Sequence, residues 1–325
     1  MFEKLIVALE ARAPIRTTDT NALRIVDGTG DGFDDFAIDD FAGRWLVESR
    51  GPFPVWLSGE EGDNLEIRKA GKEESSLPDF LISRFNSDGV PLPHSIYWKR
   101  LGDKESPRWI AGEKLAEPFV VRENGAQYWI DFNSGYSQGI FLDQRDNRLA
   151  LRNMARGKSV LNCFAYTCAF GVAGALGGAQ TTNIDLSKRY LEWGKRNYTL
   201  NGVPASAPHD FIFGDASDWL KRFRKKERKF DIILLDPPTF SRNEKGAVFT
   251  IESGFTDLVR QAAALLASRG MLFCSTNQRS ISSAEFRGLI ADGLGDLRDW
   301  KLRAGAMPAD FSGGDYLKTW WANNM

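Results

Sequence analysis

Cysteine and histidine are scarce in this chain of 325 residues. Its three cysteines, Cys163, Cys168 and Cys274, include no Cys-x-x-Cys pair, so the sequence indicates neither a disulfide framework nor a structural zinc site. The two histidines, His94 and His209, leave little material for a histidine-rich metal cluster or a Ser-His-Asp triad. We therefore expect a reducing compartment, no bound metal, and chemistry other than triad or zinc hydrolysis.

Long apolar runs are also missing. None reaches the roughly 20 residues that a membrane-spanning helix needs. Glu3, Glu10 and Arg12 interrupt the apolar N-terminal stretch, which is too polar for a signal peptide. We therefore expect a cytoplasmic protein with no membrane partner.

The chain carries almost no net charge, but its two parts differ. Lys and Arg number 42 and Asp and Glu number 43, which gives a net charge of -1. Residues 1–100 hold 18 acidic and 12 basic side chains, whereas the remaining 225 residues hold 25 acidic and 30 basic ones. The C-terminal part is therefore the better candidate for contact with an anion.

The first 125 residues have the pattern of a small α+β domain. After a short helical start, Asp and Gly clusters within residues 22–49 separate brief strands that we expect to be joined as hairpins. Residues 58–79 are polar, which predicts a stretch rich in loops around a helix. The segments 95–100 and 127–132 alternate apolar and polar residues like a second small antiparallel sheet. We assign residues 1–125 to an N-terminal domain that could bind RNA or another substrate.

From about residue 140, short apolar runs alternate with stretches of helical spacing. The apolar runs are 159–164, 181–186, 210–215, 230–236 and 270–276. This alternation predicts an α/β domain over residues 126–325, with a parallel sheet covered by helices on both faces and right-handed crossovers. We expect the final run, residues 318–323, to be an edge strand. Sheets of this kind bind ligands at the carboxyl ends of their strands.

A glycine-rich turn follows the first of these strands. It could admit a ligand close to the backbone and offer free N–H groups at a helix N-terminus. It has no GxGxxG pattern, and the Walker pattern is absent from the chain. Gly171, Gly174, Gly177 and Gly178 would equally allow a helix to pack closely on the sheet, so both interpretations stay open.

Acidic residues end the next two strands. Asp185, about twenty residues beyond the first loop, could accept hydrogen bonds from both hydroxyls of a ribose in NAD or S-adenosylmethionine. Asp215 could accept the exocyclic amino group of an adenine. Each could instead cap the helix that follows it. The two acidic residues together favour an adenosine ligand.

The fourth strand ends in Asp236-Pro237-Pro238-Thr239-Phe240. Two consecutive prolines fix the backbone and remove two N–H donors, which leaves carbonyl groups able to accept hydrogen bonds from a substrate. Phe240 could stack on the face of a base. A proline turn that merely closes the strand is the structural alternative.

Together these segments resemble the class I S-adenosylmethionine-dependent methyltransferases that modify large-subunit ribosomal RNA. The resemblance is strongest over residues 138–240, where NCFAYTCAFG, TTNIDLSKRYLEWGKRNYTLNG, GDASDWL and DIILLDPPTFS carry it. Residues 139–148 are similar to the element that leads into the catalytic domain of that family, and residues 22–49 to its small α+β domain. The resemblance implies a Rossmann-like sheet, S-adenosylmethionine as cofactor, and 23S rRNA or a precursor particle as partner.

The resemblance also implies roles for individual positions. Asp236, Pro237 and Pro238 would face the methyl group and the substrate base. Cys168 stands where relatives often have glycine, which implies a locally different backbone and a thiol that could touch the cofactor. The implied cofactor residues are Gln144, Arg145, Asn162, Phe164, Tyr166, Thr167, Gly171, Asp185, Leu186, Ser187, Asp215, Ala216 and Asp236.

The fifth strand bears on which base is modified. Methylation of C5 of a pyrimidine needs a thiolate that adds to C6, whereas N7 of guanine already carries a lone pair and mainly needs alignment. Counted from Gly270, the position of the nucleophilic cysteine in cytosine-C5 relatives is Asn277, and Cys274 lies three residues earlier. The pattern STNQR resembles the guanine-N7 branch. We favour guanine N7, with Asn277 as a catalytic candidate; cytosine C5, or a protein or small-molecule substrate, stays open.

Basic residues add candidates for contact with RNA. Arg279 could bind phosphate or guanine oxygens. Residues 221–229 hold seven basic side chains, among which Lys225 and Lys226 could contact phosphate. A solvated helix end that complements the helix dipole explains this run equally well. Four tryptophans are expected to pack in the core or between domains rather than on bases: Trp193, Trp219, Trp320 and Trp321.

Overall fold

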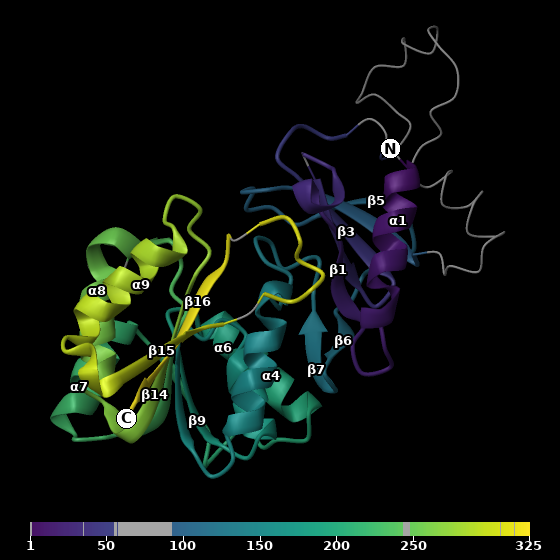
Figure 1. Ribbon diagram of the computed structural model, residues 1–325. Helices are drawn as coiled ribbons and strands as arrows, with labels where there is room; N and C mark the ends of the chain where they lie inside the picture. Colours follow the sequence, from purple (N-terminus) through teal and green to yellow (C-terminus); the bar gives the residue numbers. More distant parts are fainter. Residues whose placement is uncertain are drawn as a thin grey trace, which may run out of the picture. The chain divides into compact units, whose positions relative to one another are not determined.

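The computed structural model describes residues 2–34, 36–54, 57, 93–242, 248–305, 307–314 and 316–325. Contacts divide the chain into two compact units (Figure 1). Unit 1 comprises Met1–Leu142 and Ala309–Gly314, and unit 2 comprises Asp143–Pro308 and Asp315–Met325. The predicted polar stretch 58–79 lies outside the described residues.

Unit 1 is built on a five-stranded sheet in the order β1-β2-β3-β4-β5. The first three strands form antiparallel hairpins, as the sequence predicts. Helix α1 (Phe2–Arg12) buries Leu5 and Ala8 in one core with residues of this sheet. The strands are β1 (Ala22–Asp27), β2 (Phe36–Phe41), β3 (Arg44–Ser49), β4 (Ser95–Arg100) and β5 (Arg108–Gly112).

The prediction of a second small antiparallel sheet from residues 95–100 and 127–132 is correct for the later segment and wrong for the earlier one. Strand β4 instead extends the first sheet by pairing in parallel with β3, and its Ile96 joins the core that holds Trp45 and Val47. A separate hairpin is formed by β6 (Phe119–Glu123) and β7 (Ala126–Ile130). The alternating pattern identified both strands but not their partners, because pairing depends on burial against distant residues.

The expected domain boundary at residues 125/126 falls in the turn of the β6–β7 hairpin. Asn124 and Gly125 both have positive φ angles, 50° and 76°, as a tight two-residue hairpin turn requires. Because paired strands stay together, residues 126–142 belong to unit 1. The change in pattern near residue 140 coincides better with the end of this part of unit 1.

A short late segment, residues 309–314, completes unit 1. Asp310 is fully buried, and its carboxylate accepts a hydrogen bond from the backbone N–H of Arg24 at 2.9 Å. Arg12 donates to the Asp310 carbonyl at 3.3 Å and to Ser312 Oγ at 3.0 Å. The N-terminal sheet and helix thus depend on residues close to the C-terminal end of the sequence.

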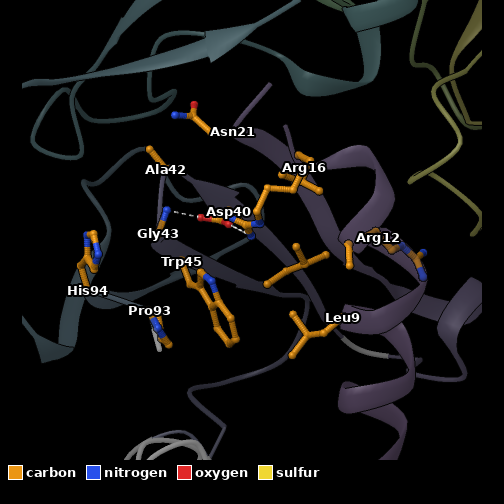
Figure 2. Close-up of a pocket in the computed structure, with 13 residues that line it drawn as sticks. Leu9, Arg12, Arg16, Asn21, Asp40, Ala42, Gly43, Trp45, Pro93 and His94 are labelled. Atoms are coloured by element: carbon orange, nitrogen blue, oxygen red, sulfur yellow. Dashed lines mark hydrogen bonds and ion pairs between the residues drawn. The ribbon is translucent and has the colours of Figure 1, made fainter. Parts of the chain in front are cut away.

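Unit 1 also contains a cavity of 440 Å³ beside α1 and the first three strands (Figure 2). The fully buried Asp40 lines it and forms an ion pair with Arg16. The backbone N–H of Gly43 donates to the same carboxylate at 2.6 Å. Burial raises the pKa of Asp40, and Arg16 opposes that rise. The carboxylate of this cavity is therefore already paired within the protein.

Unit 2 is built on a seven-stranded sheet in the order β10-β9-β8-β11-β14-β16-β15. All five predicted parallel strands are present and pair in parallel. Their bounds are β8 (Ser159–Cys163), β9 (Gln180–Asp185), β10 (Asp210–Phe213), β11 (Phe230–Leu235) and β14 (Leu266–Thr276). The remaining two are β15 (Trp300–Ala304) and β16 (Lys318–Asn324).

The prediction that residues 318–323 form an edge strand is wrong. Strand β16 lies antiparallel between β14 and β15, and β15, which the sequence analysis did not identify, forms the edge. The burial of Trp321 and Ala322 fits an interior strand. Strand β15 has five residues, pairs with β16 alone and contains no buried residue, so its pattern was weak.

Helices cover both faces of the sheet in unit 2, as predicted. Leu220, Phe255 and Phe286 pack on one face in one core cluster, and Leu151 and Phe170 pack on the other. Figure 1 shows α7, α8 and α9 grouped on one side and α4 and α6 on the other. The helices are α4 (Arg145–Met154), α5 (Ala169–Leu176), α6 (Lys188–Leu200), α7 (Ala216–Lys225), α8 (Ile251–Ala263) and α9 (Ser283–Leu294).

The four tryptophans that we expected in the interior are confirmed there. Trp193 and Trp321 are buried, and Trp219 and Trp320 pack partly buried against the larger core cluster. Within the described part of the chain, no helix combines the length and apolar character that crossing a membrane requires.

Candidate active site at the carboxyl ends of the parallel strands

The parallel pairing of β10, β9, β8, β11 and β14 brings their carboxyl ends to one edge of the sheet. Asp185 is the last residue of β9, and Asp215 follows β10 after one glycine. Asp236 comes directly after β11. Three of the predicted acidic residues therefore lie along this edge, hereafter the carboxyl edge.

The loop after β8 has an unusual backbone. Phe164, Tyr166 and Cys168 have positive φ angles of 59°, 47° and 60°, a region that non-glycine residues seldom adopt. This explains why a glycine suits position 168. The Cys168 side chain is fully buried, and a Cβ added at Gly194 would lie 2.4 Å from its Sγ. The thiol thus packs against α6 and does not reach the surface, contrary to the expectation that it could touch a cofactor.

Three other predicted cofactor residues lie beneath the carboxyl edge rather than on it. Asn162 is buried and donates from Nδ2 to Asn183 Oδ1 at 3.0 Å. A Cβ at Gly171 would meet the same Oδ1 at 2.1 Å. Thr167 is fully buried, and its carbonyl accepts from Asn197 Nδ2 at 3.0 Å. These residues support the loop from below.

Two of the glycines after β8 are explained by close packing. Gly171 leaves room for the side chain of Asn183, and a Cβ at Gly177 would lie 2.2 Å from the carbonyl oxygen of Arg152. A Cβ at Gly174 would make only ordinary contact, 3.4 Å from Thr181 Cγ2. Close packing of the helix on the sheet is therefore supported at position 171, whose neighbour Asn183 lies in β9, whereas Gly177 lies close to α4.

Asp185 is held in place by two backbone N–H groups. Tyr166 N donates to its Oδ2 and Ser187 N to its Oδ1, each at 2.8 Å. The N-terminal cap of α6 is Ser187, which accepts from Tyr190 N, so Asp185 is not the cap. Burial raises the pKa of Asp185, while the two backbone hydrogen bonds lower it. Each oxygen retains a lone pair that could accept a hydrogen bond from a hydroxyl group.

Asp215 does cap the next helix. Its Oδ1 accepts from Asp218 N at 3.0 Å at the start of α7, where Ala216 is buried. Capping one N–H leaves the carboxylate further acceptor capacity. Nearby, Leu186 and Phe213 are 38% and 40% exposed. Phe213 was missed; an aromatic residue placed last in a strand, just before Gly-Asp, was the available signal.

This arrangement fits an adenosine-containing cofactor. Asp185 can accept hydrogen bonds from the hydroxyl groups of a ribose, and Asp215 can accept one from an amino group of a base. Exposed apolar side chains such as Leu186 and Phe213 give a flat heterocycle surfaces to pack on. The polar groups of this site are carboxylates, and its walls are apolar. Among the residues described here, no group of side chains has the pattern of a metal site.

Asp236 is the centre of a hydrogen-bonded cluster. Gln144 Nε2 lies 3.3 Å from its Oδ2 and 2.7 Å from Ser275 Oγ, and Asn147 Nδ2 donates to Gln144 Oε1 at 2.8 Å. Burial raises the pKa of Asp236 to about 6. A hydrogen bond from Ser275 lowers it, and the charge of Asp143 raises it. Asp143, Asn147 and Ser275 lie within segments that the sequence analysis singled out, 139–148 and STNQR, but were given no role there.

The neighbours of this cluster differ in exposure. Arg145 is buried at the start of α4, with its Nε 3.7 Å from Asp146 Oδ1, and Gln144 is buried as well. Pro237 is buried and Pro238 is exposed. Phe240, in the short strand β12 (Phe240–Arg242), is 58% exposed, which is compatible with its predicted contact with a base.

The loop after β14 places Asn277 and Arg279 on the surface. Asn277 is exposed and directly follows the last residue of β14. The Arg279 guanidinium lies 5.0 Å from the ring centroid of Tyr316, and Lys318 Nζ donates to the carbonyls of Gln278 and Tyr316. These contacts fix the loop at the carboxyl edge.

The structure does not bring Lys225 and Lys226 to the carboxyl edge. They are exposed at the C-terminal end of α7, and β11 begins shortly afterwards at Phe230. They therefore lie at the amino ends of the strands, across the sheet from Asp236. Cationic residues at a helix C-terminus complement the helix dipole, which is the structural interpretation of this run.

Comparison with known proteins agrees with this geometry. Residues 87–289 match a family described as S-adenosylmethionine-dependent methyltransferases. The chain is 35% identical over 298 residues to "Putative ribosomal RNA large subunit methyltransferase YwbD" of Bacillus subtilis, covering 89% of this chain and 69% of that protein. It is 38% identical over 269 residues to "Ribosomal RNA large subunit methyltransferase I" of Aeromonas salmonicida, covering 76% and 66%.

A solved structure is similar across the whole length. SMU.776, a putative methyltransferase complexed with SAH, superposes with a TM-score of 0.83 at 28% identity. The match covers 99% of this chain and 80% of that one. The strand order, the strand-end carboxylates and these similarities point to the same family.

Proposed function

The chain belongs to the S-adenosylmethionine-dependent methyltransferase family, and on this premise we propose that it methylates a base of 23S ribosomal RNA at N7 of guanine. Its fold is the Rossmann-like class I sheet, and its cofactor is S-adenosylmethionine, which supplies an electrophilic methyl group. The Aeromonas salmonicida relative is named as a large-subunit rRNA methyltransferase and the Bacillus subtilis relative as a putative one, which supports RNA as the substrate.

Residues of the carboxyl edge would bind and orient the two reactants. Asp185 would hold the ribose, and Asp215 with Leu186 and Phe213 would hold the adenine. Asp236 and the carbonyl groups of the proline turn would align the substrate base. For an acceptor that already carries a lone pair, such alignment can supply about 7–11 kcal/mol of the barrier.

The burial of all three cysteines is the observation that favours N7 of guanine. Cys163, Cys168 and Cys274 are each fully buried, and burial raises the pKa of each thiol. Methylation of cytosine C5 needs an accessible thiolate nucleophile. The exposed residue after β14 is Asn277 instead.

Mass spectrometry of nucleosides from 23S rRNA tests the proposal. In a strain that lacks the gene, we expect one 7-methylguanosine to be lost and to return with the wild-type gene but not with an Asp185→Ala variant. Loss of a 5-methylcytidine instead would move the assignment to cytosine C5. Full retention of every modified nucleoside would refute an rRNA substrate.

A protein or small-molecule substrate is the alternative that the exposed residues favour least. The surface of the carboxyl edge offers Phe240 and Arg279, side chains suited to a base and a phosphate. Binding of RNA measured over a salt series separates the two, because contacts with phosphates weaken as salt rises. We propose unit 1 as a further RNA contact, which the same series tests with variants of its surface.

A further inference from the structure

We propose that Gln144 is a positioning residue for Asp236: locked by Asn147 and Ser275, its amide holds the Asp236 carboxylate in one orientation and keeps it ionised. The hydrogen-bond network stands on geometry alone. That Asp236 faces the reacting atoms rests on the proposed function. Sequence comparison with the family implied a contact between Gln144 and the cofactor, whereas the structure buries this side chain against Asp236.

The Gln144 amide has a partner at each of its ends. Its Nε2 lies 3.3 Å from Asp236 Oδ2 and 2.7 Å from Ser275 Oγ, so its two hydrogens serve two acceptors. Its Oε1 accepts from Asn147 Nδ2 at 2.8 Å. Ser275 in turn donates to Asp236. Gln144, Asn147 and Ser275 therefore form a closed network around one carboxylate.

Asn147 fixes which way the Gln144 amide faces. A reversed amide would set its NH2 group against the NH2 group of Asn147 and its carbonyl against the Asp236 carboxylate. Both contacts would be repulsive. Gln144, Asn147 and Ser275 are all at most 3% exposed, so water has little access to replace a lost hydrogen bond. An unmet donor or acceptor here is costly.

The network opposes two effects that favour protonation of Asp236. Burial and the nearby Asp143 both raise its pKa, whereas Ser275, Arg148 and Gln144 lower it, and the balance is about 6. Tyr316 donates to Asp143 Oδ2 at 3.3 Å, which spreads part of that neighbouring charge. With the donors present, Asp236 is mainly ionised at neutral pH, where a carboxylate can accept hydrogen bonds from a bound base.

Nuclear magnetic resonance of the intact protein, labelled with 13C at the aspartate carboxyl carbons, measures this directly. The Asp236→Asn variant assigns the resonance. We expect an upward shift in the pKa of Asp236 in Gln144→Met, because the side chain keeps its length but loses the N–H that donates to the carboxylate. Ser275→Ala should shift it in the same direction, and Ser275→Thr should restore it. Cys274→Ala, on the neighbouring residue of β14, should leave it unchanged.

A second measurement links the shift to methyl transfer. The pH at half-maximal transfer should move upward in Gln144→Met and Ser275→Ala together with the pKa of Asp236. An unchanged pKa of Asp236 in folded Gln144→Met would overturn the proposal, as would an equal shift in Cys274→Ala. If Gln144→Met fails to fold, Asn147→Ala decides by the same criterion, because Asn147 contacts Gln144, whereas Ser275 donates to Asp236 directly. The resonance measurement needs no substrate, so failure to methylate RNA would defeat the proposed function alone.

Discussion

One carboxylate, Asp236, carries an energetic cost in the folded protein. Its pKa is raised from 3.8 to about 6, so folding favours its protonated form. Its contribution to stability is complete below its unfolded pKa and is lost as pH rises through about 6. Functional sites commonly hold such groups, because the position that chemistry needs is seldom the position that stability prefers.

Replacing Asp236 with Asn should stabilise the protein above pH 7. The amide cannot ionise, so the variant avoids a penalty of at most about 3 kcal/mol. Urea unfolding at several pH values should show the two proteins converging as pH falls through 6 and equal near pH 4. A difference that stays constant over this range would show that Asp236 titrates normally.

Replacing Cys274 with Ser should leave methyl transfer within about twofold of the wild type, because a buried thiol with a raised pKa is no nucleophile. The assay is transfer of labelled methyl groups to RNA, with thermal unfolding as a check on folding. Complete loss of activity in a variant of unchanged stability would point to the cytosine-C5 mechanism instead.

The segment formed by β8, the following loop and α5 shows how packing, rather than ligand contact, can demand a glycine. Gly171 faces Asn183 and Tyr198, whose oxygens a Cβ would approach to 2.1 and 2.6 Å. Tyr198 and Asn183 are themselves hydrogen-bonded at 3.1 Å. The buried polar pair therefore dictates a residue without a side chain on the helix above it.

Gly171→Ala and Gly174→Ala form a matched pair on this helix. We expect Gly171→Ala to lower the free energy of unfolding by about 1–3 kcal/mol through overpacking. Gly174→Ala meets only ordinary contacts, and alanine favours the helix by about 0.5–1 kcal/mol. Chemical denaturation measures both. Equal destabilisation of the two variants would contradict the packing argument.

The sequence predicted those elements whose pattern is set locally. Apolar runs such as 230–236 identified the buried strands, and the acidic residues at their ends followed from strand direction alone. It could not predict that Asn162 and Gly171 are covered, because that depends on Asn183 and α6 folding over them. It also missed Ser275, since a serine inside a strand gives no signal until Gln144 is seen beside it.

The two units of the whole molecule are not two continuous pieces of chain. Residues 309–314 belong to unit 1, where the Asp310 carboxylate satisfies the backbone N–H of Arg24. A buried N–H that loses its acceptor costs stability. The integrity of the N-terminal sheet therefore depends on a residue encoded after most of unit 2.

Asp310→Ala should destabilise unit 1 by about 1–3 kcal/mol and speed hydrogen exchange at the Arg24 amide. Exchange measured by mass spectrometry over residues 22–27 checks this, with Asp292→Ala, an exposed site in α9 of unit 2, as control. Unchanged protection of Arg24 would mean that residues 309–314 only rest on the sheet.

This discontinuity has a consequence for how the protein is made and recombined. Synthesis on the ribosome runs from the N-terminus at about 5–20 residues per second. Unit 1 therefore cannot be completed by residues 309–314 until most of unit 2 has been synthesised. A single crossover after Leu142 between two related genes would pair Arg24 with a foreign counterpart of Asp310. Exchange of the whole of unit 1 among relatives therefore needs three breakpoints, after Leu142, before Ala309 and after Gly314, and its evolution is tied to a short stretch near the other end of the gene.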